Sequence, residues 1–249
     1  MRFFLLSVFF FLLIGGCAHN SKLKELKTAQ FHFERASHYK EKGDNIKALE
    51  NLTKIRQEFF YSPYNKRALL MTADIYFDQQ KYQQSAQTYK KYQSLYSEKK
   101  DYVLYQLGLS YKNQLPRRAE HDLKFADPAL RAFDQLLALR EKSPYKKKAL
   151  KALREILDKK AERELKTALF FKSQAWHQAG FKRIQYFIKH YPQSPLLPRA
   201  LLTAFELAQK LNQNPEKFKE RLLKEYPQSP SAQSLGDNSF LSVIKQKIL

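Results

Sequence analysis

Few residues of this 249-residue chain have the types and spacing that chemistry at a site requires. The six histidines lie apart, and no two form the His-x-x-x-His pair that places two imidazoles on one helix face. They are His19, His32, His38, His121, His177 and His190. The sequence also contains neither a glycine-rich phosphate loop nor a Gly-x-Ser-x-Gly nucleophile motif. We therefore expect no metal site, no cofactor and no catalytic residue.

Helical superhelices also occur in one class of enzymes, those that cleave murein. That chemistry requires two carboxyl groups positioned on either side of the scissile bond. Murein transglycosylases carry a Glu-Ser at their catalytic acid, and this chain contains no Glu-Ser. We expect a protein that is not an enzyme.

The residue with the clearest chemical use is Cys17, the only cysteine in the chain. An apolar run from Phe3 to Ile14, interrupted only by Ser7, precedes it. This run is shorter than the roughly 20 residues that a bilayer span requires, and it is typical of a secretory signal. The chain is therefore predicted to be exported, and a single cysteine excludes an internal disulfide framework.

The residues leading to this cysteine are Leu13-Ile14-Gly15-Gly16-Cys17. They resemble the lipobox of bacterial lipoproteins, in which a peptidase cuts before a cysteine that carries a diacylglyceryl group. The resemblance implies a cleaved signal peptide over 1–16 and a lipidated Cys17 with a tether over 17–25. An aspartate directly after the lipidated cysteine would resemble a signal for retention in the inner membrane. This chain has Ala18 at that position, which favours the outer membrane. A chance cysteine behind an ordinary signal peptide is the alternative.

The rest of the chain is organised as a repeated helix–turn–helix unit. A helix over about Phe181 to His190 is predicted by apolar residues at spacings of three and four, and Tyr191-Pro192 stops it. The sequence of the turn Tyr191–Pro195 recurs without change at Tyr226–Pro230, 35 positions later. Two further Ser-Pro-Tyr turns begin at Ser62 and Ser143. A period near 34 is the mark of tetratricopeptide (TPR) repeats, whereas one isolated repeat would leave a non-repetitive helical domain possible.

We therefore predict an all-α protein, a TPR-like superhelix of about five helix pairs. Repeats 1–3 are expected over 26–142 and repeats 4–5 over 143–230, followed by a tail over 231–249 that opens with a polar linker. Between 145 and 179 there is neither proline nor glycine. One long, continuous helix is predicted for that segment.

The net charge is +21 and the isoelectric point is near 9.8. Basic charge of this size suggests nucleic acid as a partner, but an exported lipoprotein does not normally meet it. We expect no nucleic acid. Anionic phospholipid headgroups, an acidic partner protein or a solvated helix surface remain as explanations.

A more specific resemblance covers roughly Phe31 to Pro230. The segment from Asp101 to Leu109, DYVLYQLGL, is similar to the DYVxYxxGL segment that opens the third repeat of the BamD family. That family is the TPR lipoprotein of the outer-membrane β-barrel assembly machine. It also has an insertion after this segment that ends in Asp-Pro, as Asp127-Pro128 does here, and a Pro-Tyr like Pro63-Tyr64. The strong basicity, the Lys-rich turn at Lys146 and the tail depart from the family.

The resemblance implies a non-catalytic periplasmic scaffold with two kinds of protein partner. The C-terminal repeats would hold the BamA-type barrel subunit, and the N-terminal repeats would meet unfolded outer-membrane barrel substrates. The lipid on Cys17 would contact the membrane. The family has an arginine eight positions before its Tyr-Pro tyrosine, and that position is Arg183 here. Arg183 either binds a carboxylate of the barrel subunit or pairs with a carboxylate inside the solenoid.

A second reading is a TPR lipoprotein that coordinates the envelope during division, of the TolA-binding type. Proteins of that type carry a coiled-coil segment before fewer repeats. In this chain the repeats begin almost directly after the tether, which disfavours that reading.

Overall fold

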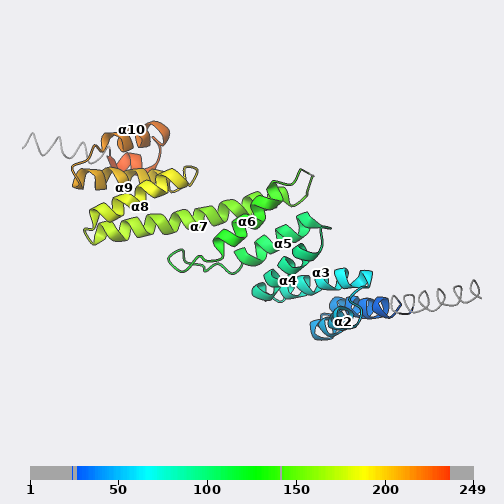
Figure 1. Ribbon diagram of the computed structural model, residues 1–249. Coiled ribbons are helices and arrows are strands. Elements are labelled where there is room, and N and C mark those ends of the chain that lie inside the picture. Colours follow the sequence, from blue (N-terminus) through cyan, green and yellow to red (C-terminus); the bar gives the residue numbers. More distant parts are fainter. Residues whose placement is uncertain (1–23, 25–26, 141, 236–249) are drawn as a thin grey trace, which may run out of the picture. The chain divides into compact units, whose positions relative to one another are not determined.

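The structure, a computed structural model, describes residues 24, 27–140 and 142–235. In this part of the chain all regular secondary structure is helical and no strand is present, which confirms the predicted all-α class (Figure 1). The elements in chain order are a helix over 27–41, α2 (Asn45–Glu58), α3 (Pro63–Asp78), α4 (Tyr82–Leu95), α5 (Lys100–Lys112), α6 (Ala126–Leu137), α7 (Lys146–Ser173), α8 (His177–His190), α9 (Leu197–Lys210), α10 (Glu216–Glu225) and a short helix over 230–235.

Consecutive helices pack on one another as the repeat period predicts. Helix α3 packs on both α2 and α4, and α9 packs on both α8 and α10. The five predicted pairs are present: 27–41 with α2, α3 with α4, α5 with α6, α7 with α8, and α9 with α10. Each helix buries one apolar stripe and exposes the opposite face, which is the arrangement that amphipathic spacing dictates.

The residues divide into two compact units. The first runs to Gln114 and includes Arg131–Ala149, and the second comprises Leu115–Leu130 and the residues from Leu150 onward. In the first unit Tyr89 and Tyr92 of α4 are fully buried against α3 and α5. In the second unit the apolar stripes of α7, α8, α9 and α10 share one core, with Phe187 at 0% exposure.

The turn inside four of the five pairs has one backbone geometry. The residues Gly43, Gln80, Ala175 and Asn212 take positive φ values of 78°, 59°, 58° and 53°. In each case the N–H of this residue donates to the carbonyl three positions back, and the next N–H donates to the carbonyl five positions back. This is the Schellman motif, which ends a helix in a left-handed residue and satisfies its last carbonyls.

Helix α7 corrects the prediction of one continuous helix over 145–179. It spans 28 residues, about 42 Å at 1.5 Å per residue, and it ends at Ser173. Ala175 terminates it by taking the left-handed conformation, so α8 begins at His177 rather than near Phe181. Gly180 therefore lies inside α8, where a Cβ would come within 3.1 Å of the carbonyl oxygen of Ala168 on α7. The missing side chain lets the two helices approach closely.

A helix follows each of the four Ser-Pro turns, as predicted for the first three. In each turn the serine Oγ accepts a hydrogen bond from a backbone N–H within the first turn of the following helix or one residue before it. The pairs are Ser62 with Tyr64, Ser143 with Tyr145, Ser194 with Leu196 and Ser229 with Ala232. These caps satisfy N–H groups that have no partner inside the helix.

The last of these caps corrects the predicted linker after residue 230. Residues 230–235 form a helix, and Ala232 and Leu235 are buried in the core of the second unit. The segment is mostly polar, which favoured the prediction of a linker. Its two apolar residues, Ala232 and Leu235, are three positions apart, so one helical turn places both of them against the core. The rest of the predicted tail lies outside the described residues.

The insertion between α5 and α6 is fixed to α7 in the second unit. Lys159 Nζ donates to the carbonyl oxygens of Pro116 and Arg117 at 2.8 and 2.6 Å. Lys166 Nζ forms an ion pair with Glu120 at 2.8 Å. The insertion is therefore held by side chains of the long helix and not by its own secondary structure.

Candidate partner-binding site

Arg183 lies on α8, one position from the buried stripe of that helix. Its neighbours Phe181 and Ile184 face the core, and both are buried. The guanidinium reaches the adjacent helix α7, where Nη1 donates to Glu164 Oε2 at 3.1 Å. In the isolated chain Arg183 therefore pairs with a carboxylate inside the solenoid, which was one of the two interpretations of this residue.

The two partners of this ion pair differ in their exposure. The side chain of Arg183 is 49% exposed, whereas that of Glu164 is 16% exposed. A guanidinium has five N–H donors in a planar fork, and in the described part of the chain this one uses Nη1 alone for an ion pair. Arg183 can therefore offer donors to a second carboxylate without leaving Glu164.

A hollow lies farther along the same two helices. It has a volume of about 430 Å³. Helix α7 and the turn after α8 supply its walls: Arg154, Leu157, Asp158, His190, Tyr191, Pro192, Gln193 and Ser194. His190 follows Arg183 by seven positions, which places the two side chains on one side of α8, two turns apart.

Aromatic rings form one wall of this hollow. The imidazole of His190 stacks on the ring of Tyr186, with 4.1 Å between the centroids. Tyr191 is buried below them, and this burial, with the nearby Tyr186 and Glu164, raises the pKa of its hydroxyl to about 12. The phenol therefore stays neutral at physiological pH, while Arg154 and Asp158 provide charge at the rim. The hollow therefore combines aromatic rings with a cation and a carboxylate.

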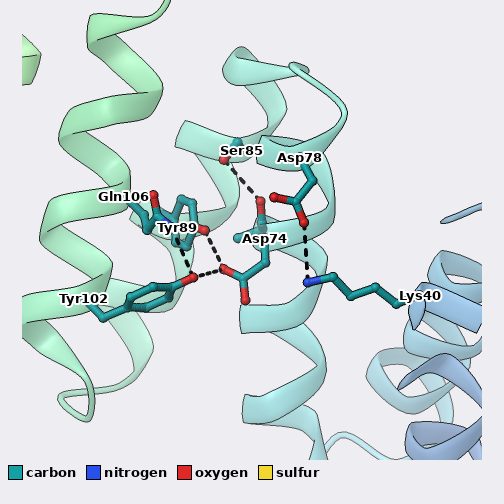
Figure 2. A network of polar contacts seen from close by, with 8 residues as sticks. Lys40, Asp74, Asp78, Ser85, Tyr89, Tyr102 and Gln106 are labelled. Atoms are coloured by element: carbon teal, nitrogen blue, oxygen red, sulfur yellow. Dashed lines mark hydrogen bonds and ion pairs between the residues drawn. The ribbon is translucent and has the colours of Figure 1, made fainter. Parts of the chain in front are cut away.

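A second polar cluster lies in the first unit and links three helices (Figure 2). Tyr89 of α4 donates its O–H to Asp74 Oδ1 at 2.5 Å. Tyr102 of α5 donates to the same oxygen at 2.7 Å, and Gln106 Nε2 donates to the Tyr102 oxygen at 3.2 Å. Figure 2 shows both phenols directed at one carboxylate oxygen of α3.

Burial controls the ionisation of this cluster. It raises the pKa of Asp74, and the hydrogen bonds from Tyr89 and Tyr102 oppose that shift. Burial and the neighbouring Asp74 raise the pKa of Tyr102 to about 12 and that of Tyr89 further above its usual range. Both hydrogen-bond partners of the Asp74 carboxylate are phenols that keep their protons at physiological pH. Neither of them can therefore exchange a proton with it. The cluster therefore joins α3, α4 and α5 and does not resemble a catalytic site.

The two predicted site residues have different outcomes. Cys17 and the signal peptide over 1–16 lie outside the described residues, so lipidation stays a prediction. Arg183 lies on the α7–α8 surface, two helix turns from the His190 that lines the hollow, and its role in docking also stays a prediction. Sequence reasoning missed Asp74, although one signal existed, since this acid stands between the buried residues Ala73 and Ile75.

Within the described ranges no three of the residue types His, Cys, Asp and Glu gather closely enough to hold a metal ion. No described helix is both long and apolar enough to cross a bilayer.

Comparison with known proteins gives one family. The sequence profile of the family described as "YfiO: Outer membrane lipoprotein" matches residues 25–222. This match covers both units and includes Asp74, Arg183 and Glu164. No curated protein matches the chain.

Several solved structures are similar in fold at low sequence identity. The MamA protein is 16% identical, with a TM-score of 0.37 and coverage of 80% of this chain and 91% of that one. The P58(IPK) TPR domain is 13% identical, with a TM-score of 0.47 and coverage of 86% and 55%. A tetratricopeptide repeat protein from Parabacteroides merdae is 16% identical, with a TM-score of 0.41 and coverage of 89% of both chains.

Proposed function

Because this chain belongs to the YfiO family of outer membrane lipoproteins, we propose that it is a non-catalytic scaffold of the machine that assembles β-barrel proteins in the outer membrane. It is held on the periplasmic side by acyl chains on Cys17. The family match over 25–222, spread across five TPR-like helix pairs, is the observation that carries the proposal. Stacked helix pairs present extended surfaces to other proteins.

The two units serve different partners in this proposal. The C-terminal helix pairs bind the BamA-type barrel subunit through the α7–α8 surface around Arg183. The N-terminal pairs meet unfolded barrel substrates as extended peptides. The support for the first contact is the half-exposed guanidinium on the same two helices as a hollow of about 430 Å³, and the support for the second is the resemblance to the BamD family.

Depletion of the protein tests the proposed function. The folded levels of many outer-membrane barrels should fall together, because all of them depend on one assembly machine. Heat-modifiable mobility on gels and surface labelling would measure these levels. A change confined to murein structure or cell division would instead support the envelope-coordination function.

The variant Arg183→Ala tests the docking surface. We expect copurification of the barrel subunit to weaken by at least tenfold, since removing one partner of a buried interface charge pair costs about 2–5 kcal/mol of binding. The thermal stability of the free protein should change little, because the guanidinium is half exposed and an ion pair made by an exposed cation contributes about 0–1 kcal/mol. Copurification from detergent-solubilised outer membrane and thermal unfolding measure the two effects.

Two further variants separate docking from internal support. Lys182→Ala removes the neighbouring exposed cation of α8 and should leave copurification unchanged. Glu164→Gln removes the internal charge while Arg183 remains, and it should preserve binding of the barrel subunit. If Arg183→Ala and Glu164→Gln lower stability alike and binding stays normal, Arg183 belongs to the internal framework and the docking site lies elsewhere.

A further inference from the structure

Three large aromatic side chains are exposed at one end of the first helix pair. Phe31 is 52% exposed, Phe60 is 58% exposed and Tyr61 is 92% exposed. We call these three residues the aromatic patch. Phe31 lies near the start of the helix over 27–41, and the other two follow the last turn of α2. A ring contact between His32 and Phe59, with 6.2 Å between centroids, places these two helix ends side by side.

The patch is held in position by the backbone and not by burial. The carbonyl of Phe60 accepts a hydrogen bond of 2.8 Å from the buried amide of Asn65. The N–H of Ser62 donates to the carbonyl of Phe59 at 3.0 Å. The rings of Phe60 and Tyr61 contact each other edge to face at 5.3 Å. Because this turn is fixed in the free protein, a partner binds the rings without first having to order them.

One cation contacts the patch, and further basic residues lie near it in the sequence. The guanidinium of Arg35 lies 5.4 Å from the ring centroid of Phe31. The basic residues on the same helix turns outnumber Glu34 and Glu58, the acidic residues described there. They are Lys24, Lys27, Arg35, Lys54 and Arg56. Aromatic rings flanked by lysine and arginine are the composition of protein segments that lie at the membrane–water interface.

The attachment point of the lipid indicates which surface is near. Cys17 precedes Lys27 by ten positions in the sequence, and ten residues of chain reach at most about 33–36 Å. The tether enters the helix over 27–41 at the end that carries Phe31. A phospholipid surface is therefore within reach of the patch whenever the anchor is inserted.

We propose that the aromatic patch contacts the headgroup region of an anionic phospholipid membrane and so orients the N-terminal unit on it. That the patch lies near a membrane rests on the lipid anchor of the proposed function. The ability of the patch to bind phospholipid is a property of the folded chain and does not depend on that anchor. Two or more acyl chains anchor a protein stably, but they attach at one point of the chain and leave the orientation of the folded unit open. The patch supplies a second contact that sets this orientation, and its cations favour anionic headgroups.

Tryptophan fluorescence in lipid vesicles tests the contact directly. The lipidated protein with Tyr61→Trp and Trp176→Phe has one tryptophan, in the patch, and the unmodified lipidated protein has one, at Trp176, which is 58% exposed in the second unit. Both are placed in vesicles of phosphatidylethanolamine and phosphatidylglycerol with bromine-labelled acyl chains. We expect blue-shifted, quenched emission from the tryptophan introduced into the patch and neither effect at Trp176.

A binding measurement with the mature chain made without its lipid isolates the patch. Replacing Phe31, Phe60 and Tyr61 by serine should weaken cosedimentation with the same vesicles by about tenfold, because three exposed rings lose their contact area. The matched control is Phe170→Ser with Trp176→Ser, which removes two rings that are 55% and 58% exposed. The control should bind as the unmodified chain does, and circular dichroism should show that all variants are folded.

The outcomes separate this inference from the proposed function. Equal quenching of the patch tryptophan and Trp176, or no quenching of the patch tryptophan, would overturn it. Normal vesicle binding by the triple serine variant would also overturn it, and loss of a copurified protein in that variant would assign the patch to a protein contact. If mass spectrometry finds no lipid on Cys17, the anchor fails, while the cosedimentation result still decides whether the patch binds lipid.

Discussion

At the scale of single residues, Asp74 is the acceptor that holds the N-terminal helices together. Its Oδ1 accepts hydrogen bonds from Tyr89 and Tyr102, which come from two different helices. Asp74→Ala leaves both phenols without this acceptor and should destabilise the protein by about 1–3 kcal/mol, the usual cost of an unsatisfied buried group. Asp74→Asn keeps an oxygen acceptor and should cost less. Urea unfolding of the two variants measures the difference.

The same residue predicts a pH dependence of stability. Burial raises the pKa of Asp74 above its unfolded value of 3.8, so the folded state binds the proton more tightly than the unfolded state. The contribution of this group to the free energy of unfolding should therefore fall as the pH rises from 3.8 to the raised pKa, and stay constant above it.

The Asp74→Asn variant isolates this effect from that of other carboxyl groups. The pKa values of Asp44, Glu98 and Glu120 are lowered by hydrogen bonds to lysines, so their contributions have the opposite sign. Subtracting the stability curve of the variant from that of the unmodified protein, between about pH 3 and pH 7, removes those shared contributions. A flat difference curve would show that Asp74 titrates alike in both states.

At the scale of elements, the left-handed turn residues decide where helices end. Ala175 has a φ of 58°, a conformation that glycine adopts without the steric cost of a Cβ. Ala175→Gly should therefore stabilise the protein by about 0.5–1 kcal/mol, after the entropy that glycine loses on folding is subtracted. Thermal or urea unfolding measures this gain.

Two matched variants test the reason for that gain. Gly43 has a φ of 78° and no atom within 4 Å of an added Cβ, so Gly43→Ala should cost about 1 kcal/mol for the conformation alone. Lys182→Gly, at an exposed position inside α8, should also cost about 1 kcal/mol. A loss of stability in Ala175→Gly would contradict the strain at this turn.

The starts and ends of the helices differ in how far the sequence predicts them. The prolines after Ser62, Ser143 and Ser194 are visible in the sequence, and the helix starts that they mark are close to where we predicted them. The proline after Ser229 also precedes a helix, where we predicted a linker. The end of α7 was not predictable in the same way, because no proline or glycine stands there. Alanine prefers a helix, and the packing of α8 on α7 overrides that preference at Ala175.

The candidate site was predictable only in part. The position of Arg183 followed from the resemblance to a family, but its partner Glu164 lies 19 residues away on another helix. Asp74 has partners that are 15 and 28 positions distant. No local pattern encodes such pairings, since they depend on which faces of neighbouring helices meet.

At the scale of the whole molecule, the proposed function makes attachment to the membrane depend on Cys17 alone. Cys17→Ala should leave an unprocessed precursor or a form that is released into the periplasm, because acyl chains contribute about 0.8 kcal/mol for each buried CH₂. Fractionation of the envelope, with immunoblotting of each fraction, measures the distribution. Unchanged recovery with the outer membrane would refute the lipoprotein assignment of this cysteine.

The packing of each helix on its neighbours in sequence has a consequence for how the chain reaches its native state. The pairs α2–α3, α3–α4, α4–α5, α8–α9 and α9–α10 all join helices that follow one another directly. Chains dominated by such local contacts fold quickly, since little loop-closure entropy is lost before the contacts form. In the proposed function the chain crosses the inner membrane unfolded, and it would then begin to acquire structure as soon as its first hairpin emerges. We expect its exposed apolar stripes to be covered within milliseconds of release, which shortens its dependence on holding chaperones.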